Sequence, residues 1–332
     1  MSEPILRVEG LRTHYLAKAA TVKAVDGVSI SLGRGRTLGL VGESGCGKTT
    51  VGLSILNLVP HPGRIVGGRV FFDSRELTAM PDHEMRQVRG RQISMIFQDP
   101  VSGLNPVLPI GLQVEEIVTN HLVVSKAEAR KMTLDVLRQM GLPQPERLVA
   151  QYPFHLSGGM CQRVMIAIAT VLNPRLIIAD EPTSNLDVTV QAAILRELRR
   201  LQEDSGVSII LITHDFGVVA QMADDVAVMY AGRIVESGKT KDIFKRPRHP
   251  YTWGLLSTLP RLDSTQGPLP SIRGTPPDLS QLPEQCAFLP RCPKAVIACR
   301  EEPAPPLEEV EPGHWAACFN PVHQEAQPSR GE

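Results

Sequence analysis

The chain has 332 residues, with 35 basic and 35 acidic side chains and 42% hydrophobic residues. That length predicts a large core with an accessory unit, and the hydrophobic fraction excludes a largely disordered protein. The balanced charge argues against a protein whose main task is to neutralise nucleic-acid phosphates. The first residues lack the layout of a secretory signal, and no run of about 18 apolar residues predicts a membrane span. We therefore expect a cytosolic chain that reaches a membrane only through partners.

The residues from 5 to 32 alternate short β-like runs with turns, at residues 5–8, 22–24 and 28–32. This pattern predicts an antiparallel sheet that precedes the main core. Tyr15 lies in this stretch, where its ring could stack on a flat ligand such as a nucleobase or pack as an ordinary tyrosine. Its position alone does not decide between the two.

The stretch from Gly42 to Thr50, GESGCGKTT, follows an apolar strand at residues 37–41 and precedes a predicted helix at 51–58. It matches the phosphate-binding pattern Gly-x4-Gly-Lys-Ser/Thr in full. Glycines let successive backbone N–H groups converge on phosphate oxygens, and the helix directs its positive end to the same anion. Lys48 can reach the β and γ phosphates, and Thr49 offers a hydroxyl to Mg²⁺. We expect a nucleotide to bind Gly42, Ser44, Gly45, Gly47, Lys48, Thr49 and Thr50.

Strands and a helical insertion follow the first helix. Residues 67–72 predict a turn and a strand, and residues 92–98 predict a strand that ends on Gln98. Beyond a turn-rich loop at 99–106, apolar residues at helical spacing predict helix between 114 and 140. The sequence LSGGMCQR at 156–163 then opens an apolar helix at 164–172. A Ser-Gly-Gly step at a helix start can bind an anion or merely cap the helix.

Two acidic side chains end the apolar strand predicted at residues 176–181. A buried parallel strand of this kind delivers them to the ligand edge of the sheet. Asp180 is placed to organise Mg²⁺, and Glu181 to orient or deprotonate an attacking water. An amphipathic helix is predicted at 188–203 after Asp187, and another buried strand at 207–213 ends at His214. His214 could hydrogen-bond a γ-phosphate or be an ordinary residue at a strand end.

The last third begins with a hairpin predicted at 226–236, turning at 231–232, and a short helix at 242–245. From residue 260 onward lie half of the 28 prolines, so we expect a loop-rich appendage with little core of its own. Four cysteines cluster there, and in a reducing cytosol such a cluster indicates a metal before a disulfide. Their spacing contains no CxxC pair and allows either zinc or an iron–sulfur cluster. The four cysteines are Cys286, Cys292, Cys299 and Cys318. His314 could replace one of these ligands, but its position favours that role no more than that of a surface histidine.

Taken together, these motifs closely resemble those of an ATP-binding-cassette ATPase. The resemblance narrows to the ATPase subunits of oligopeptide and dipeptide importers and covers nearly the whole chain. It is carried by VGESG at 41–45, FQDP at 97–100 with LNP at 104–106, residues 157–167, residues 178–191 and PRHPYT at 247–252. Cys161 stands where such proteins usually have a polar or basic residue, and Ser184-Asn185 replaces the commoner Thr-Ala. Neither departure removes a group that the mechanism needs.

The resemblance implies an α/β fold with a RecA-like P-loop core, an antiparallel β subdomain, a helical signature subdomain and a small Cys-rich C-terminal extension. It implies a nucleotide-binding domain at 1–258, its helical subdomain at about 101–172, and the extension at 259–332. Two subunits would dimerise head to tail, with ATP between the phosphate loop of one and the signature loop of the other. Tyr15 would stack on adenine, and Gln98 would contact Mg²⁺ and sense the γ-phosphate. The remaining nucleotide contacts would be Ser157, Gly158, Gly159, Gln162 and Asp187.

By the same resemblance, the chain would be the ATP-hydrolysing motor of a binding-protein-dependent importer of dipeptides or oligopeptides, on the cytoplasmic face of the membrane. Its partners would be a paralogous ATPase subunit, two membrane permease subunits and an extracytoplasmic peptide-binding protein, with no nucleic acid. Its cofactors would be ATP, Mg²⁺ and a 4Fe–4S cluster on the four cysteines, with Zn²⁺ as the alternative. Two other functions stay open: the ATPase of a nickel or metal-chelate importer, and a soluble cassette ATPase that acts on nucleic acid or the ribosome.

Overall fold

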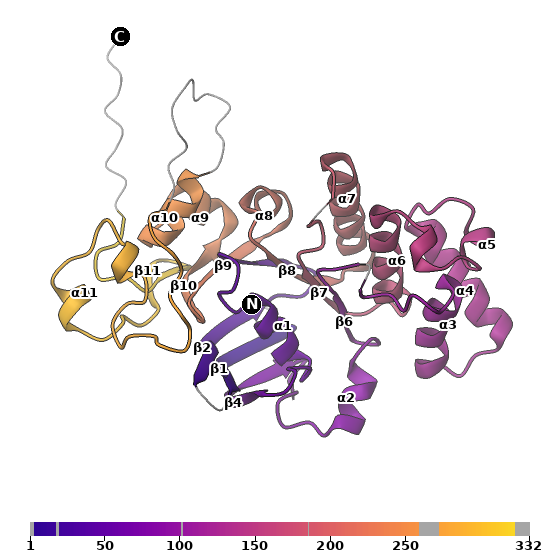
Figure 1. Ribbon diagram of the computed structural model, residues 1–332, viewed down its shortest axis with the longest axis horizontal. Coiled ribbons are helices and arrows are strands. Elements are labelled where there is room, and N and C mark those ends of the chain that lie inside the picture. Colours follow the sequence, from indigo (N-terminus) through magenta and orange to yellow (C-terminus); the bar gives the residue numbers. More distant parts are fainter. Residues whose placement is uncertain (1–2, 18–19, 101, 185, 259–271, 323–332) are drawn as a thin grey trace, which may run out of the picture.

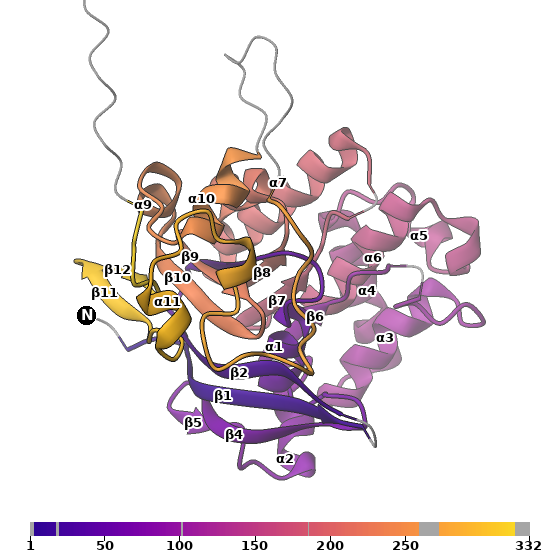
Figure 2. The same ribbon diagram turned by 60° about the vertical axis from the view of Figure 1, so that its left-hand side comes forward.

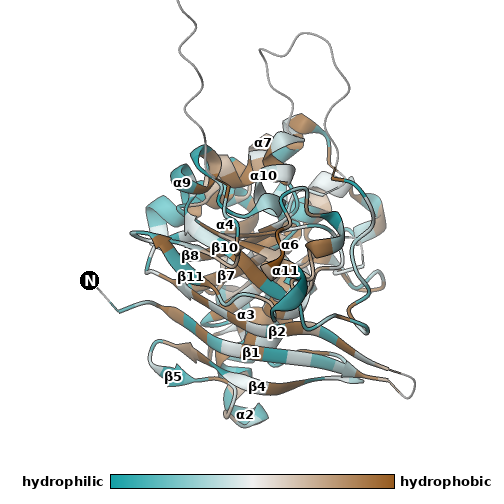
Figure 3. Cartoon of the chain, turned by 90° about the vertical axis from the view of Figure 1, so that its left-hand side faces the viewer, coloured by the Kyte–Doolittle hydropathy of each residue, from teal (hydrophilic) through white to brown (hydrophobic). Residues whose placement is uncertain are grey.

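The computed structural model describes residues 3–17, 20–100, 102–184, 186–258 and 272–322. A four-stranded antiparallel sheet, in the order β2-β1-β4-β5, holds the N-terminal part of the chain (Figure 1). Its strands are β1 (Leu6–Leu16), β2 (Thr21–Leu32), β4 (Gly63–Phe72) and β5 (Arg75–Glu76). Hydrophilic and hydrophobic residues alternate along β1, as expected for a sheet with one buried face (Figure 3). The antiparallel sheet predicted from the sequence is confirmed.

Strands β1 and β2 are longer than the short runs predicted from the sequence. Each contains a glycine that interrupts the alternation of apolar and polar residues, so the sequence shows only pieces of the strand. Gly10 has φ +54° and Gly27 has φ +84°, a backbone region that glycine adopts readily. The register between the strands shifts from Val8 to Leu11, so Gly10 lies in a bulge. This bulge breaks the two-residue alternation, and a continuous strand therefore resembles separate short runs in the sequence.

The main sheet has eight strands in the order β11-β12-β10-β9-β3-β8-β7-β6. The five strands from β9 to β6 are parallel, and β10, β12 and β11 join antiparallel at one edge. Every residue of β3, β7 and β8 is buried, as expected where both faces of a parallel sheet are covered. The bounds are β3 (Thr37–Val41), β6 (Ile93–Ile96), β7 (Leu176–Asp180), β8 (Ser208–Thr213), β9 (Asp225–Tyr230), β10 (Arg233–Lys239), β11 (Glu308–Glu311) and β12 (His314–Ala316).

Helices α3 to α6 gather at one end of the molecule, away from the antiparallel sheet (Figure 1). They are α3 (Ile110–His121), α4 (Lys126–Gln139), α5 (Pro145–Leu148) and α6 (Gly158–Thr170). The sequence predicted one helical stretch between 114 and 140, and the structure divides it. Ser125 and Glu128 form a reciprocal capping box, which starts a new helix at that point.

The other helices pack around the sheets or in the C-terminal segment. They are α1 (Lys48–Ile55), α2 (Asp82–Val88), α7 (Val188–Ser205), α8 (Phe216–Met222), α9 (Thr240–Lys245), α10 (Pro250–Ser257) and α11 (Ala298–Glu301), with 3-10 turns η1 (Pro153–His155) and η2 (Leu289–Arg291). None of the helices within the described ranges is long and apolar enough to cross a membrane.

The C-terminal segment is rich in loops, and the structure adds a contact that the sequence did not indicate. Strand β12 pairs with β10 and extends the main sheet. Phe288 is 2% exposed and packs in the same apolar cluster as Tyr230 and Tyr251. Figure 2 shows this segment, in yellow, lying against β10 and α10. Strands of three and four residues are too short to produce a readable period, which is why the sequence indicated only loops.

Candidate active site

The loop between β3 and α1 has the backbone that the phosphate-binding pattern predicts. Gly47 is the N-cap of α1 with φ +106°, and a Cβ atom there would lie 2.0 Å from the carbonyl oxygen of Ala24. A Cβ atom at Gly42 would lie 2.2 Å from the carbonyl oxygen of Met229. Both positions therefore require glycine for close packing of the loop on its neighbours. Ser44, Gly45 and Thr49 are exposed, whereas Thr50 in α1 is buried.

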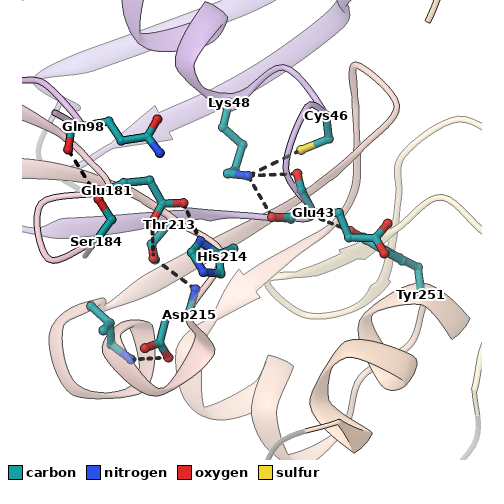
Figure 4. A network of polar contacts seen from close by, with 12 residues as sticks. Glu43, Cys46, Lys48, Gln98, Glu181, Ser184, Thr213, His214, Asp215 and Tyr251 are labelled. Atoms are coloured by element: carbon teal, nitrogen blue, oxygen red, sulfur yellow. Dashed lines mark hydrogen bonds and ion pairs between the residues drawn. The ribbon is translucent and has the colours of Figure 1, made fainter. Parts of the chain in front are cut away.

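Lys48 is buried, and its ammonium group lies within this loop. Its Nζ donates to the carbonyl oxygen of Gly42 at 2.8 Å and to that of Glu43 at 3.0 Å (Figure 4). These two carbonyls hold the positive charge at the centre of the loop, where the start of α1 also favours the binding of an anion. The arrangement suits the binding of phosphate groups.

Asp180 ends β7 beside the start of α1. Burial raises the pKa of its carboxyl group, opposed by a hydrogen bond with the Thr49 side chain. Among the described residues, Oδ1 of Asp180 is buried and has no hydrogen-bond partner. A buried carboxylate oxygen without a partner, next to a threonine hydroxyl, offers the oxygen ligands that Mg²⁺ prefers. The residues present therefore fit a magnesium ion.

Glu181 follows Asp180 with φ +47°, and this left-handed backbone turns its side chain toward the end of β8. Its Oε1 accepts the backbone N–H of His214 at 3.0 Å and lies 2.8 Å from Nδ1 of that ring. Its Oε2 accepts from the hydroxyl of Thr213 at 3.2 Å. Figure 4 shows this carboxylate held between the two strand ends, with Gln98 and Lys48 on the same side. An oriented carboxylate at this edge can position a water for attack.

Gln98 lies just beyond β6, and its backbone carbonyl accepts from the Ser184 hydroxyl at 3.3 Å. This contact joins the loop after β6 to the loop after β7, and places Gln98 beside Glu181 (Figure 4). The structure thus brings together Lys48, Asp180, Glu181, Gln98 and His214 at one sheet edge. Of the Ser184-Asn185 pair noted above as a departure, Asn185 lies outside the described residues.

The signature residues lie at the start of α6, in the group of helices α3 to α6. Ser157 is the N-cap, and its hydroxyl accepts the N–H of Met160 at 3.4 Å. A Cβ atom at Gly158 would meet none of the described residues within 4 Å, whereas one at Gly159 would lie 2.9 Å from Val190 at the start of α7. Gln162 is buried, and no hydrogen-bond partner of its Nε2 is found in the described part of the chain. The capping role is therefore present, and the open N-terminus at Gly158 leaves room for a ligand.

Asp187 and Tyr15 also have local roles. Asp187 is the N-cap of α7, and its carboxylate accepts from the backbone N–H groups of Thr189 and Val190 at 3.0 Å each. The Tyr15 ring packs against Gly63 on the neighbouring strand, where a Cβ atom would lie 2.7 Å from Cε1 of the ring. Nucleotide contacts by these two residues stay predictions.

The four clustered cysteines line one small pocket behind α10, which His249 and Phe288 also line. Burial raises the pKa of the thiols of Cys286 and Cys292, and raises that of Cys318 to about 12. The predicted ligands therefore converge, although they are separated by up to 32 positions along the chain. Over the described residues, no three cysteine, histidine or acidic side chains lie close enough together to hold a single metal ion.

His314 corrects a further expectation, because it is not a surface histidine. It is 2% exposed, and its Nε2 lies 2.7 Å from Oε1 of Glu236, which is itself fully buried. It does not line the cysteine pocket, so the structure does not place it as a replacement ligand. Strand pairing of β12 with β10 buries it, and no local pattern in the sequence indicates that pairing.

Sequence reasoning also missed a contact between the C-terminal part of the chain and the phosphate loop. The hydroxyl of Tyr251 in α10 accepts the backbone N–H of Glu43 at 2.8 Å. Tyr251 is fully buried, and desolvation raises the pKa of its hydroxyl, which therefore stays protonated. The two residues are 208 positions apart. In the sequence, Tyr251 belongs to the PRHPYT tract at 247–252, but that tract does not indicate that its partner is Glu43.

Comparison with known proteins gives the following similarities. The family described as ABC transporter matches residues 25–184, and that described as oligopeptide/dipeptide transporter, C-terminal region, matches residues 235–299. The dipeptide transport ATP-binding protein DppD of Bacillus subtilis is 49% identical over 298 residues, 90% of this chain and 89% of the relative. The oligopeptide transport ATP-binding protein OppD of Salmonella typhimurium is 46% identical over 320 residues, 96% and 95% of the two chains. The dimeric, post-hydrolysis ATP-binding cassette MJ0796 with ADP and Pi has a TM-score of 0.65 and 27% identity, covering 71% of this chain and 98% of that one.

Proposed function

The chain belongs to the ABC transporter family, whose ATP-binding proteins hydrolyse ATP, and on that premise we propose that it is the motor subunit of a peptide importer. The observation that carries the chemistry is the convergence of Lys48, Asp180 and Glu181 at one sheet edge. Peptide cargo is supported by the oligopeptide/dipeptide transporter match at residues 235–299 and by relatives named for dipeptide and oligopeptide transport.

In the proposed reaction, the loop from Gly42 to Thr50 binds the phosphates of ATP and Lys48 turns its ammonium group from the loop carbonyls toward them. Thr49, Asp180 and Gln98 would hold Mg²⁺, which when bound neutralises charge on the phosphate oxygens. Glu181 orients the attacking water and takes up its proton. His214 holds Glu181 through Nδ1, so that Nε2 is the ring atom free to face the γ-phosphate.

We place the nucleotide-binding domain at residues 1–258 with its helical subdomain at about 101–172, and the extension at 259–332. The signature residues of this chain would then complete the ATP site of a second ATPase subunit, and that subunit would complete the site here. Ser157, Gly158 and Gly159 at the start of α6 support this arrangement, because a Cβ atom at Gly158 would meet no atom of the described residues within 4 Å. We propose a paralogous subunit as the partner, together with two permease subunits and an extracytoplasmic peptide-binding protein. The chain would thus lie on the cytoplasmic face of the membrane.

We propose that the four cysteines hold a 4Fe–4S cluster rather than Zn²⁺. The donor set supports this choice, because a cluster is held by four thiolates that each bind a separate iron. Structural zinc sites usually contain a Cys-x2–4-Cys ligand pair, and the spacing of these four cysteines contains none. When bound, the cluster would join the segments around the cysteine pocket. Iron and sulfide analysis of the chain purified without oxygen is the test: four of each supports the cluster, and one zinc ion contradicts it.

The test of the main proposal is uptake of labelled dipeptides and oligopeptides by the purified complex in liposomes, with ATP supplied to the ATPase side. We expect uptake that depends on ATP hydrolysis and on the binding protein. Glu181→Gln is expected to retain ATP binding and to lose about 10²–10⁴-fold in turnover. Glu302→Gln, in an exposed part of the extension, is the matched control and should hydrolyse ATP at the wild-type rate. Uptake of a nickel chelate without uptake of any peptide would contradict the peptide assignment.

A further inference from the structure

Arg291 is a buried cation in the C-terminal segment. Its side chain is 5% exposed, and it ends η2 one position before Cys292. Because an unpaired buried charge is strongly unfavourable, such a residue indicates a specific partner. That partner is 248 positions away, in the phosphate loop.

The guanidinium group of Arg291 forms a two-pronged ion pair with Glu43. One terminal nitrogen donates to Oε2 of Glu43 at 2.7 Å, and the other donates to Oε1 at 2.9 Å. The Nε group donates to the carbonyl oxygen of Arg273 at 3.0 Å, and the group lies 5.9 Å from the ring centres of both Tyr230 and Phe288. The planar guanidinium group is therefore held in one orientation, and its charge is paired.

Glu43 is the second residue of the phosphate loop, and each of its polar groups has a partner. Its carboxylate binds Arg291, its N–H donates to Tyr251, and its carbonyl oxygen accepts from Lys48 at 3.0 Å. Two of these three partners belong to the C-terminal third of the chain. The turn that presents the loop to phosphate is thus held by residues more than 200 positions further along the chain.

We propose that Arg291 is a positioning residue for the phosphate-binding loop, so that the folded state of the cysteine-bearing segment sets the affinity of the chain for Mg–ATP. The ion pair of Glu43 and Arg291 links the phosphate loop to the C-terminal segment. Arg291 is the last residue of η2, which lies in the chain between Cys286 and Cys292, two residues that line the cysteine pocket. The proposal rests on the proposed function only in taking ATP as the ligand, and it does not depend on the cargo.

The physical basis is the order of the loop before binding. A phosphate loop must present several N–H groups in one geometry, and an already ordered loop does not lose conformational freedom when the nucleotide binds. Truncating Arg291 frees the Glu43 side chain and leaves its carboxylate unpaired in a half-buried site. Arg291 touches none of the reacting atoms, so its loss should weaken binding more than it slows the chemical step.

The experiment measures the dissociation constant of Mg–ATP and the KM and kcat of hydrolysis, with the full chain in its complex. We expect Arg291→Ala to raise the dissociation constant and KM by about tenfold, with a smaller change in kcat. Arg291→Lys retains the positive charge but lacks the two-pronged guanidinium group. Its dissociation constant should lie between those of the wild type and Arg291→Ala. Arg300→Ala is the matched control, because Arg300 is an exposed arginine that follows Cys299 as Arg291 precedes Cys292.

A double-mutant cycle separates this role from a general loss of stability. If the ion pair carries the effect, Arg291→Ala should change the dissociation constant little in a Glu43→Gln background. A purely structural role would lower the melting temperature of both variants while leaving ATP affinity unchanged in the folded protein. That result, or additive effects on affinity, overturns the proposal. If Arg291→Ala does not fold, the double variant Glu43→Gln/Arg291→Gln replaces both charges with neutral side chains. A dissociation constant of this double variant for Mg–ATP equal to that of the wild type would also overturn the proposal.

Failure of this inference is distinguishable from failure of the proposed function. If the wild-type complex neither binds nor hydrolyses ATP, the proposed motor function is wrong. If the wild type hydrolyses ATP and Arg291→Ala has the wild-type dissociation constant, only the positioning role is wrong.

Discussion

The ring of His214 and the carboxylate of Glu181 form a direct pair, with Nδ1 2.8 Å from Oε1. The same oxygen also accepts the backbone N–H of His214, so the end of β8 holds the carboxylate at the end of β7 by two contacts. Glu181 is largely buried while the His214 side chain is 65% exposed. The carboxylate is thus held in place by a histidine whose ring reaches the surface.

This pair predicts that His214→Ala lowers ATP turnover while ATP still binds. Without the ring, Glu181 keeps only one backbone and one hydroxyl contact, and loss of its orientation is expected to cost about 10²-fold in kcat. Turnover by the purified complex at saturating Mg–ATP provides the measurement. His83→Ala, at an exposed position in α2, is the control and should show wild-type turnover. Full activity of His214→Ala would show that Glu181 does not need this support.

Asp180 gives opposite predictions for stability and binding. Burial raises the pKa of its carboxyl group, so ionising it destabilises the folded chain at neutral pH, and that cost disappears as the pH falls through the raised pKa. Asp180→Asn should therefore raise the melting temperature of the nucleotide-free chain by about 2 °C, and weaken binding of Mg–ATP. Asp204→Asn, on the exposed face of α7, should leave Mg–ATP binding unchanged. A lower melting temperature for Asp180→Asn would contradict this account of the unpaired oxygen.

His249 predicts acid sensitivity of the C-terminal segment. It is buried, and desolvation lowers the pKa of its ring from 6.5 to about 4, opposed by the nearby Glu236 carboxylate. The unfolded chain therefore binds a proton more readily than the folded chain, so stability falls as the pH drops from 6.5 toward 4.

The measurement is the melting temperature of the wild type and of His249→Asn at pH 7 and pH 5. Asparagine can still accept the N–H of Tyr251 at the start of α10, as Nδ1 of His249 does at 3.1 Å, but does not titrate. We expect a smaller fall in melting temperature for the variant. An equal fall in both proteins would assign the acid sensitivity to other groups.

A substitution at Gly158 tests whether the start of α6 is only a helix cap or also a ligand site. A Cβ atom there meets none of the described residues within 4 Å, so Gly158→Ala should keep the melting temperature of the single chain within about 1 °C. If the start of α6 contacts ATP held by a partner subunit, the same change should lower turnover of the complex. Gly67→Ala in β4, where the nearest atom would be 3.8 Å away, is the control. Unchanged turnover for Gly158→Ala would indicate that the serine–glycine step is only a cap.

The buried Glu236 links three elements and predicts how the C-terminal segment is held. It accepts the backbone N–H groups of Arg248 and His249 at 2.7 and 2.9 Å, and its Oε1 lies 2.7 Å from Nε2 of His314. Glu236→Ala leaves these buried groups unpaired and should cost about 3 kcal/mol of stability. Proteolysis of the folded chain should then cut the C-terminal segment first, and denaturant unfolding gives the free energy. Resistance equal to that of the wild type would contradict the role of Glu236.

The sequence by itself determined the parts of this protein whose signals are local. The phosphate loop, the acidic end of β7 and the hairpin of β9 and β10 each depend on a few consecutive residues, and their residue types need a particular backbone or burial. Helix and strand periods likewise placed most elements to within a few residues, although α1 ends at Ile55 rather than at 58. The resemblance to a known family then predicted roles that spacing alone left open, and the nucleotide contact at the Ser-Gly-Gly step stays a prediction.

Only the tertiary structure decided the contacts between distant segments. The pairing of β12 with β10, the burial of His314 and the ion pair of Arg291 with Glu43 join residues far apart in the chain. Short strands carry too few residues for a period, and a charged side chain shows nothing in the sequence about its partner. Burial makes these contacts specific, because a charge or hydrogen-bonding group removed from water must find its partner within the fold. The C-terminal segment therefore contacts both the main sheet and the phosphate loop, although its composition indicated only a loop-rich appendage.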